Sequence, residues 1–157
     1  MVFFIIGRVN SGKSTKLLGL YKRKKCGDGF ILKKVHVKQK LWGYRIRRLS
    51  TEEEEDFATW RDNIPKKWHE AFVYGPFSFS KKGIEFADKI VDEIISKGIE
   101  PVFIDEIGPL EVEEKGLYAV IKKVLSLDKT VYITVREDVF AEAVEKFGIK
   151  EYKVLKL

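Results

Sequence analysis

The chain has 157 residues, of which 45% are apolar and 34% charged, with 12 Gly, 4 Pro and the single cysteine Cys26. This composition is too apolar for a disordered chain and too charged for a membrane-embedded one, and a lone cysteine excludes an internal disulfide or a cysteine-based metal site. The length predicts a single domain over residues 1–157. The opening apolar run of six residues has no basic region before it, so we expect a cytoplasmic protein without a signal peptide.

The charge is distributed unevenly along the chain. Residues 1–50 hold 14 Lys or Arg and one acid, Asp28, whereas residues 51–157 hold 16 basic and 23 acidic side chains. The net charge of +6 therefore conceals a strongly basic N-terminal third, which favours the phosphates of a nucleotide or a nucleic acid. One Gln and two Asn stand beside 23 Lys and 16 Glu, a bias typical of proteins from thermophiles.

Buried strands alternate with amphipathic helices. Continuous apolar runs predict strands over 2–6, 101–104 and 131–135, and a last strand is expected over 152–155. Apolar stripes predict helices over 13–23, 115–125 and 138–147. A further helix is expected to begin after its capping residue Ser80 and to end at Gly98. Alternating residues predict a basic β-hairpin over about 29–49 that turns near 39–43, and the polar segment 50–70 is expected to be a loop with one helical turn. The pattern predicts a mostly parallel sheet with helices on both faces.

A phosphate-binding loop lies between the first predicted strand and the first predicted helix. The segment matches G-x-x-x-x-G-K-[ST] at every defined position, and its residues are Gly7, Arg8, Val9, Asn10, Ser11, Gly12, Lys13, Ser14 and Thr15. Backbone N–H groups of such a loop point at the α- and β-phosphates. We expect Lys13 to reach the β- and γ-phosphates and the hydroxyl of Ser14 to bind Mg²⁺.

An acidic pair follows the second buried strand. Asp105 and Glu106 come directly after four apolar residues, as in a Walker B strand. Asp105 is expected to hold Mg²⁺, and Glu106 is expected to orient and deprotonate the attacking water. Thr134, at the end of the third buried strand, is expected to contact the γ-phosphate or the water if that strand lies between the other two, with Arg136 adding positive charge.

These motifs resemble those of a known family. The chain resembles the small P-loop nucleoside triphosphatases described from thermophiles, which include the human cancer-related nucleoside triphosphatase. The resemblance rests on Gly7–Thr15, on the basic hairpin segments around Trp42–Leu49 and on the run Asp105-Glu106-Ile107-Gly108 with Glu111. The resemblance implies a three-layer P-loop NTPase fold and Mg²⁺-dependent hydrolysis of several nucleoside triphosphates with little base selectivity. The chain departs from the family pattern at Val9 and Asn10, where the family has Pro and a small residue, and at Arg136, where it has His.

A phosphate-binding loop also occurs in proteins with three other functions. A GTPase is disfavoured because no N-K-x-D motif accompanies the D-x-x-G formed by Asp105–Gly108. A small-molecule kinase of the nucleoside or nucleotide type stays open, although no arginine-rich lid segment is present. A nucleic-acid-binding P-loop ATPase also stays open, with phosphate contacts and base stacking from hairpin residues. Those residues are Lys33, Lys34, Lys38, Lys40, Arg45, Arg47 and Arg48, beside Trp42 and Tyr44.

Other side chains carry a weaker signal. Trp42, Trp60 and Trp68 are candidates for stacking on a base, although packing is the more common role of tryptophan. The isolated His36 and His69 are expected at the surface rather than on a metal.

Overall fold

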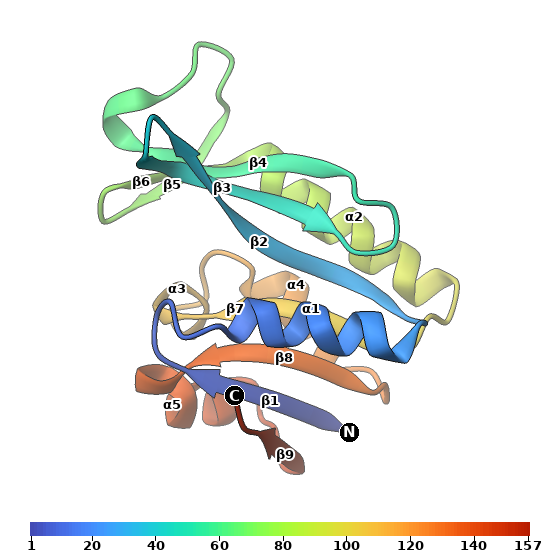
Figure 1. Ribbon diagram of the computed structural model, residues 1–157. Helices are drawn as coiled ribbons and strands as arrows, with labels where there is room; N and C mark the ends of the chain where they lie inside the picture. The colour runs from blue at the N-terminus through green and yellow to red at the C-terminus, as the bar shows by residue number, and fades with distance from the viewer.

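The computed structural model describes residues 1–157 and contains one sheet of nine strands (Figure 1). The strand order is β5-β6-β4-β3-β2-β7-β8-β1-β9. The strands are β1 (Val2–Gly7), β2 (Asp28–Val37), β3 (Lys40–Arg48), β4 (Glu54–Trp60), β5 (Glu70–Tyr74), β6 (Phe77–Ser80), β7 (Val102–Ile107), β8 (Val131–Arg136) and β9 (Tyr152–Leu155).

The sheet has a parallel half and an antiparallel half. Strands β2, β7, β8, β1 and β9 pair in parallel, and we call them the parallel half. Strands β3, β4, β6 and β5 continue from β2 by antiparallel pairs and form the antiparallel half. The α/β class is confirmed, but the expectation of a mostly parallel sheet is corrected to a mixed sheet. The basic hairpin is not a separate insertion, because β2 pairs with β7 on one side and β3 on the other.

Helices cover both faces of this sheet. They are α1 (Lys13–Lys24), α2 (Lys81–Ser96), α3 (Pro109–Val112), α4 (Tyr118–Leu125) and α5 (Phe140–Lys146), with 3₁₀ turns at Arg61–Asn63 and Glu137–Val139. One core of six buried residues includes Leu17 of α1 and Phe103 of β7; the other, of 21 buried residues, receives α2, α4 and α5. Figure 1 accordingly shows α1 in front of the parallel strands and α2 behind β2 and β4. No helix combines the length and apolarity that a membrane crossing needs.

Most elements expected from hydrophobic periodicity are confirmed. The cap of α2 is the hydroxyl of Ser80, which accepts a hydrogen bond from the N–H of Gly83 at 3.3 Å. The hairpin turns at Lys38 and Gln39, at the start of the expected range 39–43, and both residues have positive φ. The helix expected over 115–125 starts only at Tyr118.

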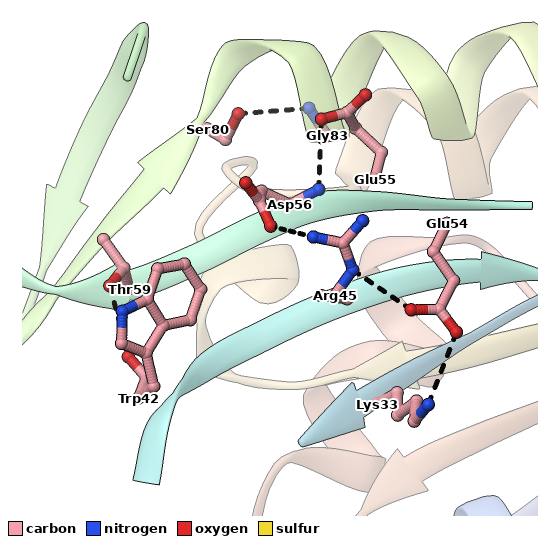
Figure 2. A network of polar contacts seen from close by, with 9 residues as sticks. All are labelled: Lys33, Trp42, Arg45, Glu54, Glu55, Asp56, Thr59, Ser80 and Gly83. Carbon is pink, nitrogen blue, oxygen red and sulfur yellow. Dashed lines mark hydrogen bonds and ion pairs between the residues drawn. The ribbon is translucent and has the colours of Figure 1, made fainter. Parts of the chain in front are cut away.

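The prediction of a loop with one helical turn over 50–70 is wrong for 54–60 and for Glu70, which belong to β4 and β5, whereas the 3₁₀ turn Arg61–Asn63 supplies the expected helical turn. The acidic run Glu52–Glu55 has the composition of a solvated surface, yet its second half enters the sheet. Figure 2 shows the reason: Arg45 of β3 donates to Glu54 at 3.0 Å and also contacts Asp56, while Lys33 of β2 donates to Glu54 at 3.4 Å. Opposite charges on neighbouring strands make the acidic strand compatible with the sheet.

Candidate functional site

The phosphate-binding loop joins the end of β1 to the start of α1. Lys13 is the first residue of α1, and its side chain is buried and folds back over the loop, where Nζ donates a hydrogen bond to the carbonyl oxygen of Arg8 at 2.7 Å. The hydroxyl of Ser11 donates to the same oxygen at 2.6 Å. The loop is therefore closed on itself by side chains, and its backbone N–H groups lie beside the N-terminus of α1, where anions are stabilised.

Two glycines give the loop its shape. A Cβ at Gly7 would meet the hydroxyl of Ser11 and the side chain of Leu157, both of which would have to move to admit it. Gly12, which precedes α1, has a φ of 93°, a left-handed conformation that residues with a side chain rarely adopt. The backbone conformation therefore favours glycine at position 12, and side-chain packing favours it at position 7.

Asp105 is the buried centre of the site. Its Oδ2 accepts hydrogen bonds from the hydroxyl of Ser14 at 2.7 Å and from the N–H of Leu32 at 3.1 Å, and its Oδ1 accepts one from the hydroxyl of Thr134 at 2.5 Å. Burial raises the pKa of Asp105, whereas these three donors and Lys13 act in the opposite direction. Strand β8 lies between β7 and β1, which is the strand order that the expected role of Thr134 at the site requires. The hydroxyl of Thr134 holds the carboxylate of Asp105 in place.

The donor set around Asp105 fits a hard divalent cation. Ser14 and Asp105, the two residues expected to bind Mg²⁺, face each other across 2.7 Å and offer only oxygen atoms. Mg²⁺ prefers such oxygen ligands and keeps several waters of its own, so a few protein oxygens are sufficient. The residues present therefore suit Mg²⁺.

Glu106 lies next to Asp105 at the end of β7. Burial and the neighbouring Asp105 raise the pKa of Glu106, and the cations Lys13, Arg136 and Lys34 partly offset this effect. A carboxylate of raised pKa is a stronger base than an exposed one. Glu106 also lines the same cavity as Lys13 and Ser14.

That cavity has a volume of about 690 Å³ and is open to solvent. The expected loop residues Val9, Asn10, Ser11, Gly12, Lys13, Ser14 and Thr15 all line it, together with Arg136. Gly7, Arg8, Asp105 and Thr134 do not: they lie behind or beside the lining. The expected contact of Thr134 with the nucleotide stays a prediction.

The cavity lining also includes residues that the sequence did not assign to a nucleotide site. Lys34 of β2 lies beside Asn10, whose side chain it contacts. Aromatic side chains from the antiparallel half complete the lining, namely Tyr44, Phe57, Tyr74, Phe77 and Phe79. The alternation Phe77-Ser78-Phe79-Ser80 is a strand signal that was available in the sequence, but nothing in it indicates a position opposite the phosphate loop.

The tryptophans and histidines lie outside the cavity lining. Trp60 stacks on Phe77 with ring centroids 4.8 Å apart, and Trp42 meets Trp68 edge to face at 6.3 Å. The indole N–H groups of Trp60 and Trp68 donate to Leu41 and Ser78. These contacts give the tryptophans packing roles. His36 and His69 are exposed, as expected, and neither belongs to a cluster of metal-binding side chains.

Most of the basic hairpin side chains have partners within the protein. Lys33, Arg45 and Arg47 pair with Glu52, Glu54 and Asp56; Arg48 donates to the buried Asp28 and to Glu93; Lys34 contacts Asn10. Of the seven cations considered for nucleic acid, Lys34, which contacts the neutral amide of Asn10, and Lys38 and Lys40 at the turn have no acidic partner. The acids that pair with the other four come mainly from β4 and its preceding turn, so the basic excess of this surface is reduced.

Glu111 lines the cavity, but its carboxylate is used to hold the backbone of the adjoining loop. Its two carboxylate oxygens accept hydrogen bonds from the N–H groups of Gly108 at 2.9 Å and Leu117 at 3.0 Å, which ties the turn after β7 to the start of α4. Burial raises the pKa of Glu111 to about 7, against 4.5 for an ordinary glutamate, even though the backbone donors act in the opposite direction.

Glu111 should therefore make stability depend on pH. A carboxyl whose pKa is raised on folding contributes its stability fully below about pH 4.5, and this contribution is lost as the pH rises through about 7. We expect the free energy of unfolding of the wild type to fall by about 3 kcal/mol more than that of Glu111→Gln between these limits. Chemical denaturation at a series of pH values measures the difference. Glu113→Gln, which alters an exposed neighbour, should keep the wild-type slope, and equal slopes for all three proteins would contradict the assignment.

Comparison with known proteins agrees with this geometry. The chain matches the NTPase family over residues 2–157. Its fold is similar to that of THEP1 from the hyperthermophile Aquifex aeolicus, with a TM-score of 0.74 at 19% identity over 100% of this chain and 90% of that one. It is also similar to a human cancer-related nucleoside triphosphatase, with a TM-score of 0.69 at 21% identity over 99% of this chain and 87% of that one. No curated protein sequence gives a significant match.

The family match spans the phosphate loop, the Asp105–Glu106 pair and both halves of the sheet, and it confirms the resemblance inferred from the motifs. The structural similarities, at these low identities, establish the shared fold. The chain therefore belongs to the NTPase family and is a nucleoside-triphosphate hydrolase.

Proposed function

We propose that the protein hydrolyses the β–γ bond of nucleoside triphosphates in a Mg²⁺-dependent reaction with low base selectivity, releasing a nucleoside diphosphate and phosphate. One observation carries this proposal: Lys13, Ser14 and Glu106 line one cavity, and Asp105 lies directly behind Ser14. A phosphate cradle, a cation site and a base therefore meet at one point.

Binding of the triphosphate uses the loop and the start of α1. The backbone N–H groups of the loop receive the α- and β-phosphates, and Lys13 exchanges its hydrogen bond to Arg8 for the β- and γ-phosphates. Ser14 and Asp105 hold Mg²⁺, which when bound neutralises charge on the phosphate oxygens. Thr134 keeps Asp105 in place through its hydrogen bond.

Hydrolysis needs a base beside the γ-phosphate. Glu106 lines the cavity with Lys13, and its raised pKa suits it to accept a proton from water. The water oxygen bonds to the γ-phosphorus, the bond to the β,γ-bridging oxygen breaks, and the electron pair leaves with the diphosphate. Arg136 and Lys34, which also line the cavity, supply positive charge for the transferring group.

Low base selectivity follows from the absence of groups that would read a base. The sequence has no N-K-x-D motif, and its three tryptophans are packed outside the cavity lining. The nucleic-acid alternative loses its main support, because most of the hairpin cations are paired with acids of the same chain. The paired cations favour a hydrolase that needs no nucleic acid.

The proposal predicts the metal and substrate dependence of phosphate release. With ATP, GTP, CTP and UTP each supplied without an acceptor, we expect kcat/KM values within about tenfold of one another. EDTA should abolish release and added Mg²⁺ should restore it. Release that EDTA does not affect would contradict the metal role, and a preference above a hundredfold for one base would contradict the low selectivity.

Substitution of a metal ligand sharpens this test. Asp105→Asn should raise the Mg²⁺ concentration needed for half-maximal activity, because an amide binds a hard cation more weakly than a carboxylate. Asp128→Asn, at an exposed loop position, should leave that concentration as in the wild type. The same Mg²⁺ requirement in both variants would remove Asp105 from the metal site.

A further inference from the structure

The cavity extends beyond the groups that hold the phosphates. At one end lie the phosphate loop, Glu106 and Arg136, and at the other end lie aromatic side chains that the proposed hydrolysis does not use. We call this second part the aromatic end; its residues are Tyr44, Phe57, Tyr74, Phe77 and Phe79. Water alone requires no aromatic wall, so this part of the cavity needs another explanation.

Strand order places the aromatic end on the γ-phosphate side of the site. Starting from β1, which carries the phosphate loop, the sheet continues through β8, β7, β2, β3, β4 and β6. Glu106 lies at the end of β7, and the aromatic side chains lie on β3, β4, β6 and its hairpin partner β5. Glu106 is thus between the loop strand and the aromatic end, as Figure 1 shows for the strands that carry them.

This position argues that a second molecule, not the nucleoside, fills the aromatic end. In the proposed function the γ-phosphate lies at Lys13, Ser14 and Glu106, and the nucleoside is attached at the opposite end of the triphosphate, to the α-phosphate. A molecule beyond Glu106 therefore faces the γ-phosphate from the side opposite the leaving diphosphate. That is the position of an attacking group in an in-line transfer.

The aromatic end is a preformed surface. Phe77 stacks on Trp60 with centroids 4.8 Å apart and meets Tyr44 edge to face at 5.6 Å. Phe79 meets Phe57 at 5.7 Å and stacks on Phe72 at 4.9 Å. Rings held by other rings lose little freedom when a flat ligand packs on them, so such a wall favours an aromatic partner.

Tyr44 and Glu106 line the same cavity. Burial raises the pKa of the Tyr44 phenol, and the charge of Glu106 adds to this effect. A ligand that packs on Tyr44 and Phe77 therefore lies in the cavity that also contains the carboxylate of Glu106. The cavity volume of about 690 Å³ lies within the range of roughly 300–1,000 Å³ that holds small organic ligands.

We infer that the aromatic end is a phosphoryl-acceptor site for a small molecule that carries an aromatic or heteroaromatic ring and a hydroxyl group. The inference rests on the proposed function, because it assigns a second substrate to the same γ-phosphate. The hydroxyl oxygen bonds to the γ-phosphorus, the bond from phosphorus to the β,γ-bridging oxygen breaks, and its electron pair leaves on the nucleoside diphosphate. The hydroxyl proton passes to Glu106, and the products are a phosphate monoester and the diphosphate. Hydrolysis is then the reaction that water undergoes when the acceptor is absent.

The test uses 2-naphthylmethanol, a neutral aromatic alcohol, as the probe. Its fluorescence reports binding to the full chain with and without a non-hydrolysable ATP analogue, and ³¹P NMR separates its phosphate monoester from inorganic phosphate when ATP is present. We expect the probe and the analogue to bind together and the monoester to form. ATP binding and acceptor-free phosphate release are measured in the same samples, so a failure of the proposed function is seen there, and a failure of the acceptor site is seen only with the probe.

Substitutions in the aromatic end locate the site. Phe77→Leu removes the ring that stacks on Trp60 and should reduce the monoester yield at least tenfold more than acceptor-free phosphate release. Phe72→Leu is the matched control, because Phe72 stacks on Phe79 in the same hairpin but does not line the cavity, and it should retain the wild-type yield. Tyr44→Leu, on a different strand, should reproduce the Phe77→Leu result, and it keeps the test informative if the hairpin variant does not fold.

Four results would overturn the inference. Competition between the probe and the ATP analogue would assign the aromatic end to the nucleoside. Probe binding without any monoester would remove the acceptor role. No binding of the probe to the wild type, or equal effects of Phe77→Leu and Phe72→Leu, would show that the aromatic wall only packs.

Discussion

Glu106→Gln is expected to reduce the turnover of nucleoside triphosphates by about 10²- to 10⁴-fold, the usual contribution of a positioned general base. Glutamine keeps the size and much of the hydrogen bonding of glutamate but cannot accept the proton of the attacking water. Because water is activated in the transition state and not in the bound ground state, nucleotide affinity should change by only a few fold. The rate of phosphate release measures turnover, and equilibrium binding of a non-hydrolysable ATP analogue measures nucleotide affinity.

The control for this variant is Glu137→Gln, which alters an exposed carboxylate that pairs with Arg8 at 3.4 Å. It should turn over at close to the wild-type rate. Near-normal turnover by Glu106→Gln would show that Glu106 is not the base. Glu111 is the other carboxylate of the run that begins at Asp105. Both of its carboxylate oxygens accept backbone hydrogen bonds, so its substitution is expected to act through the loop it holds.

Lys13→Ala should weaken both nucleotide binding and turnover. The ammonium group contacts phosphate oxygens in the ground state and in the transition state, and a charge-assisted hydrogen bond of about 1.5–3 kcal/mol corresponds to a loss of about ten- to a hundredfold in affinity. Turnover should fall further, since negative charge near the γ-phosphate is no longer stabilised as it transfers. Titration calorimetry with an ATP analogue and steady-state kinetics measure the two losses.

Lys22→Ala provides the comparison on the same helix. Lys22 lies exposed in the last turn of α1, far from the loop, so its removal changes the net charge equally without touching the cavity. The effect of Lys13→Ala beyond that of Lys22→Ala is the contribution of the loop lysine. If both variants bind and hydrolyse nucleotide as the wild type does, the phosphate-loop assignment is wrong.

The sequence by itself predicted the strands β1, β7, β8 and β9, the helix α1 and the residues proposed for the phosphate end of the site. The run Val2–Ile6, the glycines of the loop and the start of α1 are contiguous, and each depends on local conformational preference or on burial of a continuous apolar segment. Asp105 and Glu106 were predictable for the same reason, because they directly follow a buried strand. Parallel strands end at one edge of a sheet, so these residues meet wherever the intervening chain goes.

Tertiary structure alone decided how the antiparallel half continues beyond the β2–β3 hairpin, and everything that depends on it. The acids of β4 disguise a strand, since their charge is neutralised only by Arg45 and Lys33 from strands earlier in the chain. Thr134 holds Asp105, and the aromatic side chains of β3, β4 and β6 face the phosphate loop, through contacts between residues distant in sequence. Local periodicity records which residues are buried, but it does not record which strand becomes the neighbour of which, because strand pairing depends on the free energy of the whole sheet.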